Sequence, residues 1–165
     1  MLDDMTNLQS LLKDPSLLAT QGYLAGEWVD GEGGATFPVR NPARGDVVAN
    51  VADFTRAQTA DAIAKAEIAQ RSWAARTGKE RANILRRWYD LMMENADDLA
   101  TILTAEQGKP LAESKGEIGY GASFIEFFAE EAKRIYGETI PGHQPDKRIT
   151  VIKQPIGVAA SITPW

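Results

Sequence analysis

The sequence predicts an α/β protein, because two kinds of periodicity alternate along its 165 residues. Segments rich in Val, Phe, Tyr and Trp come first, separated by glycines, as in short strands joined by turns. A long central region follows, in which apolar residues recur at helical spacing. Near the end, "KRITVIKQ" alternates polar and apolar residues and "VAASI" is a short apolar run. These two patterns favour an edge strand and a buried strand.

Composition and charge restrict the classes of function. The apolar and charged fractions, 44% and 25%, are those of one globular domain with a core of its own. The formal net charge is −5, and the basic residues are scattered among acidic ones, which argues against a nucleic-acid partner. No apolar run approaches the about 18 residues of a membrane span, and the acidic start is unlike a secretory signal. We therefore expect a cytoplasmic protein with no membrane partner.

The first 20 residues predict a peripheral segment. A short helix is expected over Asn7 to Leu18, although Pro15 and the lack of a long periodic pattern keep it small. Strand-like segments follow from Gln21 to Asp30 and from Thr36 to Val51. The second contains "NPARGD", which has the residues of a tight turn, so these segments should form hairpins.

Four helices are expected between residues 55 and 136. The first two each begin with a capping box, formed by Thr55 with Gln58 and by Thr77 with Glu80. Their apolar residues recur on one face, as in amphipathic helices that pack together. The side chains expected to pack the helices on one another are Trp73, Trp88, Leu91 and Phe128.

The third and fourth helices have clear boundaries. The third should run from Ala96 to Gln107, because two aspartates fall in its first turn and Gly108 follows its last residue. Pro110 can then start the fourth helix, which we expect to continue to about Tyr136.

Several motifs, in this order and spacing, resemble those of a known family: "GEWVDG", "NPARGD", "ERANILRRW", "EQGKPLAE", "FFAEEAKRIYGETIPG" and "QPIGVAASITPW". The short ones are common, whereas "EQGKPLAE" and "PIGVAASITPW" at this separation are specific. From about Gly22 to Trp165, the chain resembles the N-terminal third of the aldehyde dehydrogenase superfamily. It looks most like bacterial succinate-semialdehyde or glutarate-semialdehyde dehydrogenases, which typically use NADP.

This resemblance implies an organisation that periodicity could not have assembled. After the N-terminal segment 1–20, residues 21–146 would form the N-terminal part of the nucleotide-binding domain, with its strand pair and helices. Residues 147–156 would be a strand of an oligomerisation hairpin. Residues 157–165 would be the first strand of a Rossmann-like sheet, cut short. The full-length enzyme would then be a homodimer or homotetramer.

The chemistry of the family needs groups that this chain lacks. Oxidation of an aldehyde uses a thiolate nucleophile, oxyanion donors, hydride transfer to a nicotinamide and a base that activates water. The chain contains no cysteine, and the resemblance puts the catalytic Cys, the general-base Glu and the oxyanion Asn beyond Trp165. We expect no catalytic residue here and no activity from this chain alone. The complete enzyme would oxidise succinate semialdehyde, or a similar short semialdehyde, with NADP or NAD through a cysteine thiohemiacetal.

The last four residues are candidate cofactor contacts. The resemblance assigns Ile162, Thr163, Pro164 and Trp165 to a loop that contacts the nicotinamide half of NAD(P). Without it, Pro164 and Trp165 are better explained as a strand-ending turn and a core aromatic. The choice between NAD and NADP stays open, because the residues that read the ribose 2′ position would lie further downstream.

Three aromatic residues are candidate substrate-tunnel residues. Tyr120, Phe124 and Phe127 recur at helical spacing, a pattern that more often marks core packing than a substrate wall. The resemblance places their helix beside the entrance tunnel for the aldehyde, which is the small-molecule partner expected of the full-length enzyme.

No metal site is expected. His143, the only histidine, lies in a loop without a second metal ligand, so its side chain should be solvated. Glu106 matches a position at which family members often hold a monovalent cation, together with a carbonyl near Val39 or Arg40. A carboxylate that faces solvent at a helix end is the simpler explanation.

A function of a different class is a stable helical binding or assembly module, in which "KRITVIKQ" pairs with a strand of a partner. The codons that follow Trp165 distinguish the two. An immediate in-frame "NFP" would indicate a truncated enzyme, whereas a stop codon together with cooperative melting of the isolated chain would favour the module.

Overall fold

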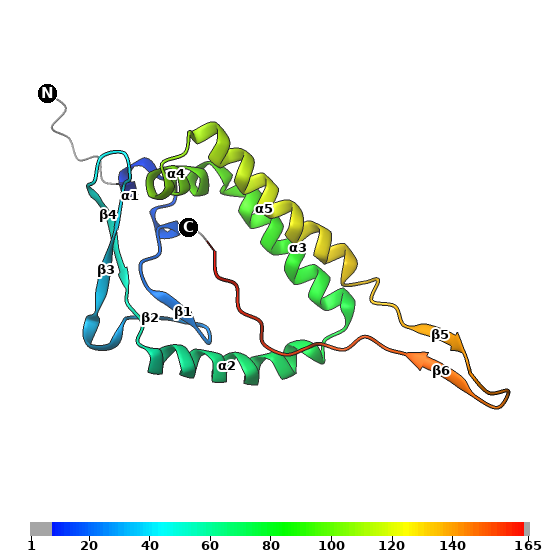
Figure 1. Ribbon diagram of the computed structural model, residues 1–165. Coiled ribbons are helices and arrows are strands. Elements are labelled where there is room, and N and C mark those ends of the chain that lie inside the picture. The colour runs from blue at the N-terminus through cyan, green and yellow to red at the C-terminus, as the bar shows by residue number, and fades with distance from the viewer. Residues whose placement is uncertain (1–7, 164–165) are drawn as a thin grey trace, which may run out of the picture.

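The computed structural model describes residues 8–163 and has an open arrangement of helices and hairpins (Figure 1). Helices α3, α4 and α5 lie together, the first two hairpins lie opposite them, and α2 runs between the two groups (Figure 1). The third hairpin, β5–β6, projects away from the rest (Figure 1). The elements are α1 (Leu8–Leu11), β1 (Gly22–Leu24), β2 (Glu27–Val29), β3 (Thr36–Arg40), β4 (Val47–Ala52), α2 (Arg56–Ala74), α3 (Gly78–Glu94), α4 (Ala96–Gln107), α5 (Leu111–Glu131), β5 (Glu138–Pro141) and β6 (Arg148–Val151), with 3-10 turns at Pro15–Leu17 and Glu32–Gly34.

The three hairpins are antiparallel, and the first two confirm the predicted strand segments. In β1–β2, Tyr23 lies opposite Trp28, and their rings meet edge to face with centroids 5.1 Å apart. In the turn between β3 and β4, the Asn41 side-chain oxygen accepts hydrogen bonds from the backbone amides of Ala43 and Arg44. Gly45, in the same turn, has a φ of +81°. The residues of "NPARGD" therefore form a turn because an Asx side chain and a glycine meet its backbone requirements.

Both predicted capping boxes are confirmed. The Thr77 hydroxyl accepts from the Glu80 amide at 3.3 Å, and the Glu80 carboxylate accepts from the Thr77 amide at 2.8 Å. The box at Thr55 has the same reciprocal pattern with Gln58. The side-chain amide of Gln58 also donates to the Asp30 backbone carbonyl at 3.0 Å. This bond connects the start of α2 to the end of the first hairpin.

The helices pack through small side chains, contrary to the sequence prediction. Helix α5 lies along α3 and against α4, and α1 packs on α4. The buried residues at these contacts are mostly alanines: Ala82, Ala100, Ala122 and Ala129. Trp88, Leu91 and Phe128 are instead 54%, 41% and 56% exposed, so they do not form the predicted core. Small residues let the helix backbones approach closely and leave the large apolar side chains at the periphery.

The end of the chain differs from the predictions in two ways. Helix α5 ends at Glu131 and not near Tyr136, because residues 138–141 pair with residues 148–151 as a hairpin, which takes the chain away from the helix axis. Residues 157–163 form no strand, although residues 157–165 were expected to be the first strand of a sheet. A parallel strand needs neighbours for its amides and carbonyls, and this segment pairs with no strand of residues 8–163. Within the same residues, no helix is both long and apolar enough to cross a membrane.

Candidate functional site

An aromatic stripe, formed by Tyr120, Phe124 and Phe127, runs along the outer face of α5. The three side chains are 66%, 47% and 56% exposed. The Tyr120 and Phe124 rings meet edge to face, with centroids 4.9 Å apart, and Phe127 makes a similar contact with Phe128 at 5.3 Å. Exposed aromatic residues gathered on one helix face are typical of a surface that contacts a ligand or another part of a protein. The explanation by core packing does not hold for residues 8–163.

The aromatic residues of α5 are exposed because small residues occupy the face that packs against the other helices. Its buried face carries Ser114, Ala122 and Ala129, and the Ser114 hydroxyl bonds that of Thr104 in α4 at 2.8 Å. Small residues thus face the neighbouring helices, and the aromatic residues are left on the outside. The sequence showed the helical spacing of the aromatic residues, but it could not show which face of α5 the other helices cover.

The candidate cofactor residues lie at the end of an exposed segment. Residues 152–163 run from the base of the β5–β6 hairpin over α2 toward the first hairpins (Figure 1). Ile162 is 98% exposed, and Thr163 takes part in an interaction with its surroundings. Pro164 and Trp165 lie outside the described residues. The assignment of these four residues to the cofactor therefore stays a prediction.

Glu106 lies in the last turn of α4, close to the turn between β3 and β4. Gly108, which ends the helix with a φ of +82°, packs against Pro42, since a Cβ built on Gly108 would lie 2.7 Å from the Pro42 ring. Partial burial raises the pKa of the Glu106 carboxyl. Residues 8–163 contain no group of three His, Cys, Asp or Glu residues that could hold a metal ion. A solvated carboxylate stays the simpler explanation of Glu106, with a monovalent cation as the alternative.

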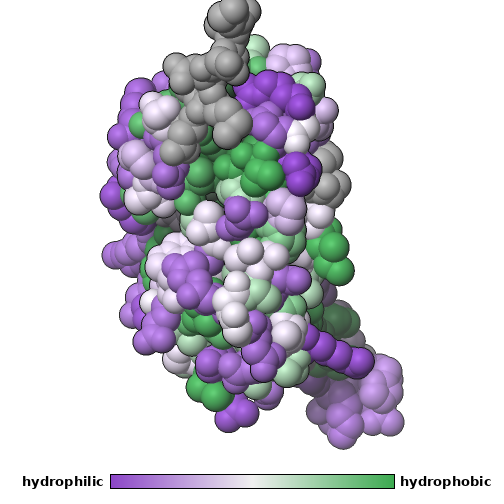
Figure 2. Space-filling model, turned by 90° about the vertical axis from the view of Figure 1, so that its left-hand side faces the viewer, coloured by the Kyte–Doolittle hydropathy of each residue, from purple (hydrophilic) through white to green (hydrophobic). Residues whose placement is uncertain are grey.

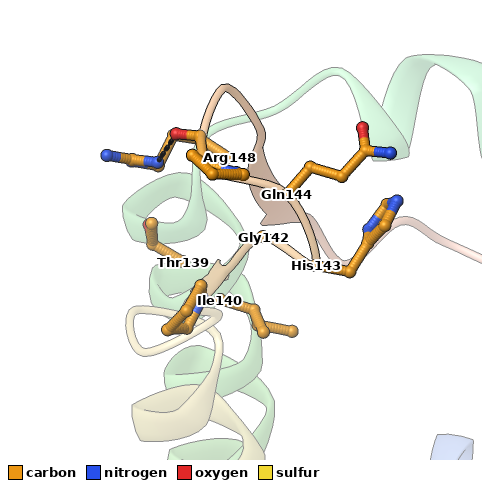
Figure 3. A pocket seen from close by; sticks show the side chains of 8 residues that line it. Thr139, Ile140, Gly142, His143, Gln144 and Arg148 are labelled. Atoms are coloured by element: carbon orange, nitrogen blue, oxygen red, sulfur yellow. Dashed lines mark hydrogen bonds between the residues drawn. The ribbon is translucent and has the colours of Figure 1, made fainter.

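The loop of the β5–β6 hairpin encloses a hollow, shown in Figure 3. The Arg148 guanidinium donates to the carbonyl of Lys147 at 2.8 Å and extends away from His143 and Gln144 (Figure 3). The carboxylate of this loop, Asp146, pairs with Lys147 at 3.0 Å and does not line the hollow with His143. The hollow thus has one cationic side chain, already engaged by backbone, and a solitary imidazole, which is not a catalytic arrangement.

A cavity of about 610 Å³, not foreseen from the sequence, lies between α1, β4 and the α4–α5 junction. Its walls are largely aliphatic, and its two charged residues, Arg44 and Asp46, neutralise each other in a two-pronged ion pair with both contacts at 2.9 Å. On the side of the molecule that carries β3 and β4, apolar surface is interspersed with polar surface (Figure 2). The hydroxyls of Thr101 and Thr104, which also line it, are engaged by the Asp97 carbonyl at 2.9 Å and by Ser114 at 2.8 Å. The cavity therefore has no reactive group that is poised for catalysis.

Comparisons with known proteins agree with this geometry. The sequence model that describes the aldehyde dehydrogenase family matches residues 28–165 of this chain. The chain is 62% identical over 154 residues to a glutarate-semialdehyde dehydrogenase of Pseudomonas aeruginosa, and 58% identical over 154 residues to the NADP(+) succinate-semialdehyde dehydrogenase of Escherichia coli. Each alignment covers 93% of this chain and 32% of the relative. The chain thus spans about a third of the length of the curated relatives it matches.

A solved structure shows the same relationship in three dimensions. The crystal structure of an Escherichia coli NADP-dependent enzyme superposes with a TM-score of 0.85 at 57% sequence identity, covering 88% of this chain and 30% of that one. The hairpins and helices described above are therefore the N-terminal part of the aldehyde dehydrogenase fold. By sequence and by fold, this chain belongs to the aldehyde dehydrogenase family.

Proposed function

We propose that this chain supplies the N-terminal part of an enzyme that oxidises succinate or glutarate semialdehyde to the carboxylate with NADP or NAD. The observation that carries the proposal is the identity of 62% and 58% to relatives named for these two activities. The TM-score of 0.85 to an NADP-dependent enzyme supports the same cofactor class.

In this proposal the chain positions substrate and cofactor, and the reacting groups come from elsewhere in the enzyme. The 165 residues contain no cysteine, so the thiolate that adds to the aldehyde carbon to form a thiohemiacetal lies outside them. The chemistry that NAD(P) would supply when bound is acceptance of the hydride at its nicotinamide. This chain alone is therefore inactive.

The aromatic stripe on α5 would form one wall of the path that the aldehyde takes. Its rings present apolar surface of the kind that lines small-molecule sites, and this surface would hold the methylenes of the semialdehyde and exclude water. The carboxylate of the substrate would then be bound by groups outside the stripe. Ile162, Thr163, Pro164 and Trp165 would contact the nicotinamide half of the cofactor.

The complete enzyme would be a cytoplasmic homodimer or homotetramer without nucleic-acid or membrane partners. The β5–β6 hairpin supports assembly, because both of its strands are exposed along their length and it projects from the molecule (Figure 1). Unpaired strand edges are ready templates for pairing with another chain.

An assay of the purified chain tests its inactivity. With succinate semialdehyde and NADP, we expect no NADPH formation above that of a boiled control. Turnover by the chain alone would overturn the claim that the reacting groups lie outside these residues.

A chimeric enzyme tests the activity of the whole. Residues 22–165 would replace the matching third of the Escherichia coli NADP(+) succinate-semialdehyde dehydrogenase. We expect a folded chimera that oxidises succinate or glutarate semialdehyde, with the parent enzyme as the control. A chimera that folds and assembles like the parent but turns over neither substrate would contradict the proposal.

A further inference from the structure

A groove of about 1060 Å³ lies where the end of α2, the start of α3, the end of α5 and residues 153–157 meet. Its lining contains cationic residues and no acidic one, although the whole chain has 23 acidic and 18 basic residues. Positive charges around a concave surface focus the electrostatic potential there. The groove is therefore an electropositive site on an acidic protein. The cationic residues that line it are Arg76, Lys79, Arg81, Lys133 and Lys153.

The groove is built by close backbone contact between segments far apart in the sequence. A Cβ built on Gly78 would lie 2.4 Å from the Ala132 carbonyl oxygen, so the start of α3 packs directly on the chain that leaves α5. This contact brings Lys79 and Lys133 to the same groove. Lys153 comes from the segment after β6 and completes the lining.

The five cations differ in how far their charge is already compensated. The Arg81 guanidinium donates to the Arg76 carbonyl at 2.5 Å, and Lys133 forms an ion pair with Glu130 at 2.7 Å. Arg76 lies near the Glu80 carboxylate. Among residues 8–163, no carboxylate lies within 4.0 Å of the ammonium groups of Lys79 and Lys153. Lys133 is thus the cation of the groove that is paired with a carboxylate, and Arg81 is held by backbone carbonyls. Within residues 8–163, the Lys79 and Lys153 ammonium groups have neither kind of partner, so they are the most available to a ligand.

We propose that this groove binds a small multivalent phosphate anion between Lys79 and Lys153. Trp73 and Ile156 add apolar surface to the groove, and the converging lysines attract an anion that carries more than one charge. A long nucleic acid does not fit, because the cations converge on one concavity and the net charge of −5 repels an extended polyanion.

Calorimetric titration of the 165-residue chain with inorganic pyrophosphate tests the proposal. At low ionic strength we expect saturable binding of one pyrophosphate per chain. The substitutions Lys79→Gln and Lys153→Gln should each weaken binding roughly tenfold, since each removes one close opposite charge. The matched control is Lys65→Gln on α2, because Lys65 pairs with Asp61 at 2.8 Å and does not line the groove. It should leave the affinity unchanged.

Two further measurements keep the test decisive. Amide chemical shifts at residues 76–81 and 153–157 of the unaltered chain should move on titration, a result that does not depend on variants that fold. Titration with ADP identifies the source of the anion: tighter binding than pyrophosphate indicates a nucleotide, and equal or weaker binding indicates a free phosphate compound. Absence of saturable pyrophosphate binding, or equal weakening in Lys65→Gln, would overturn the proposal.

Discussion

The buried carboxylate of Asp98 in α4 accepts a hydrogen bond from the backbone amide of Asp14 at 2.8 Å, across 84 residues of sequence. Its other oxygen accepts from the Lys13 amide at 3.0 Å. Leu8 and Leu12 are buried, and α1 packs on α4. The segment is thus fixed to α4 by the Asp98 carboxylate, by apolar contact and by an exposed ion pair of Lys13 with Asp97. The described part of the N-terminal segment is therefore anchored to the helices.

Asp98→Ala should destabilise the chain by about 1–3 kcal/mol, because two backbone amides would lose their acceptor in a partly buried position. Urea denaturation measures the loss, and hydrogen exchange of residues 12–18 should become faster. The matched control is Asp97→Ala, which removes only exposed ion pairs to Lys13 and Lys115. If both variants unfolded at the same urea concentration, the anchoring role of Asp98 would be wrong.

Two glycine substitutions should have opposite effects on stability. Gly78→Ala places a Cβ against the Ala132 carbonyl oxygen, so α3 must move from the end of α5, at a cost of about 1–3 kcal/mol. Gly116→Ala, in the interior of α5, meets nothing within 4 Å and should stabilise the chain by about 1 kcal/mol. Thermal melts of both variants decide the matter. A stabilising Gly78→Ala would contradict the close contact.

Glu106→Gln should stabilise the chain at neutral pH and have no effect in acid. Burial raises the pKa of this carboxyl, so the folded state holds its proton to higher pH than the unfolded state. Stability from this group is present below the unfolded pKa and is lost as the pH rises through the raised value. Since the burial is only partial and solvent still reaches the residue, the gain in Tm at pH 7 should be on the order of 1 °C. A larger gain at pH 4 than at pH 7 would reverse the sign and refute the assignment.

Phe127→Ala should affect the chimeric enzyme more than the isolated chain. The ring is 56% exposed, so its loss should change the stability of the isolated chain by no more than about 0.5 kcal/mol. If the aromatic stripe forms the wall of the aldehyde path, the KM of the chimera for succinate semialdehyde should rise several-fold. The control is Ile63→Ala on α2, which is equally exposed at 56%. Identical kinetics for the two variants would exclude Phe127 from the path.

Backbone amides of residues 158–162 should exchange rapidly with solvent in the isolated chain. The segment is exposed and pairs with no described strand, and amides without a partner are not protected. Hydrogen exchange followed by mass spectrometry provides the measurement, on a sample shown to be monomeric. Slow exchange in that monomer would mean that the segment has found a closed arrangement of its own.

The features that the sequence determined by itself are local ones. The capping boxes at Thr55 and Thr77, the turn at Asn41 and the glycine that ends α4 each satisfy backbone groups with a partner a few residues away. Such signals need no knowledge of the rest of the chain. Family membership could also be recognised from the motifs, because their order and spacing are specific. The aromatic stripe could be assigned to a helix because the spacing of its residues along the sequence is helical.

The tertiary structure alone decided which faces are covered. Two acidic residues in the first turn of α4 looked alike as dipole partners, yet Asp98 is buried under the N-terminal segment while Asp97 is solvated. Helix periodicity marked Trp88 and Phe128 as core, whereas alanines hold the helices together. The cations around the groove at Lys79 and Lys153 meet only because the chain folds back on α3. Periodicity shows that a face is apolar or charged, but its burial depends on contacts between segments far apart in sequence, which a local pattern does not contain.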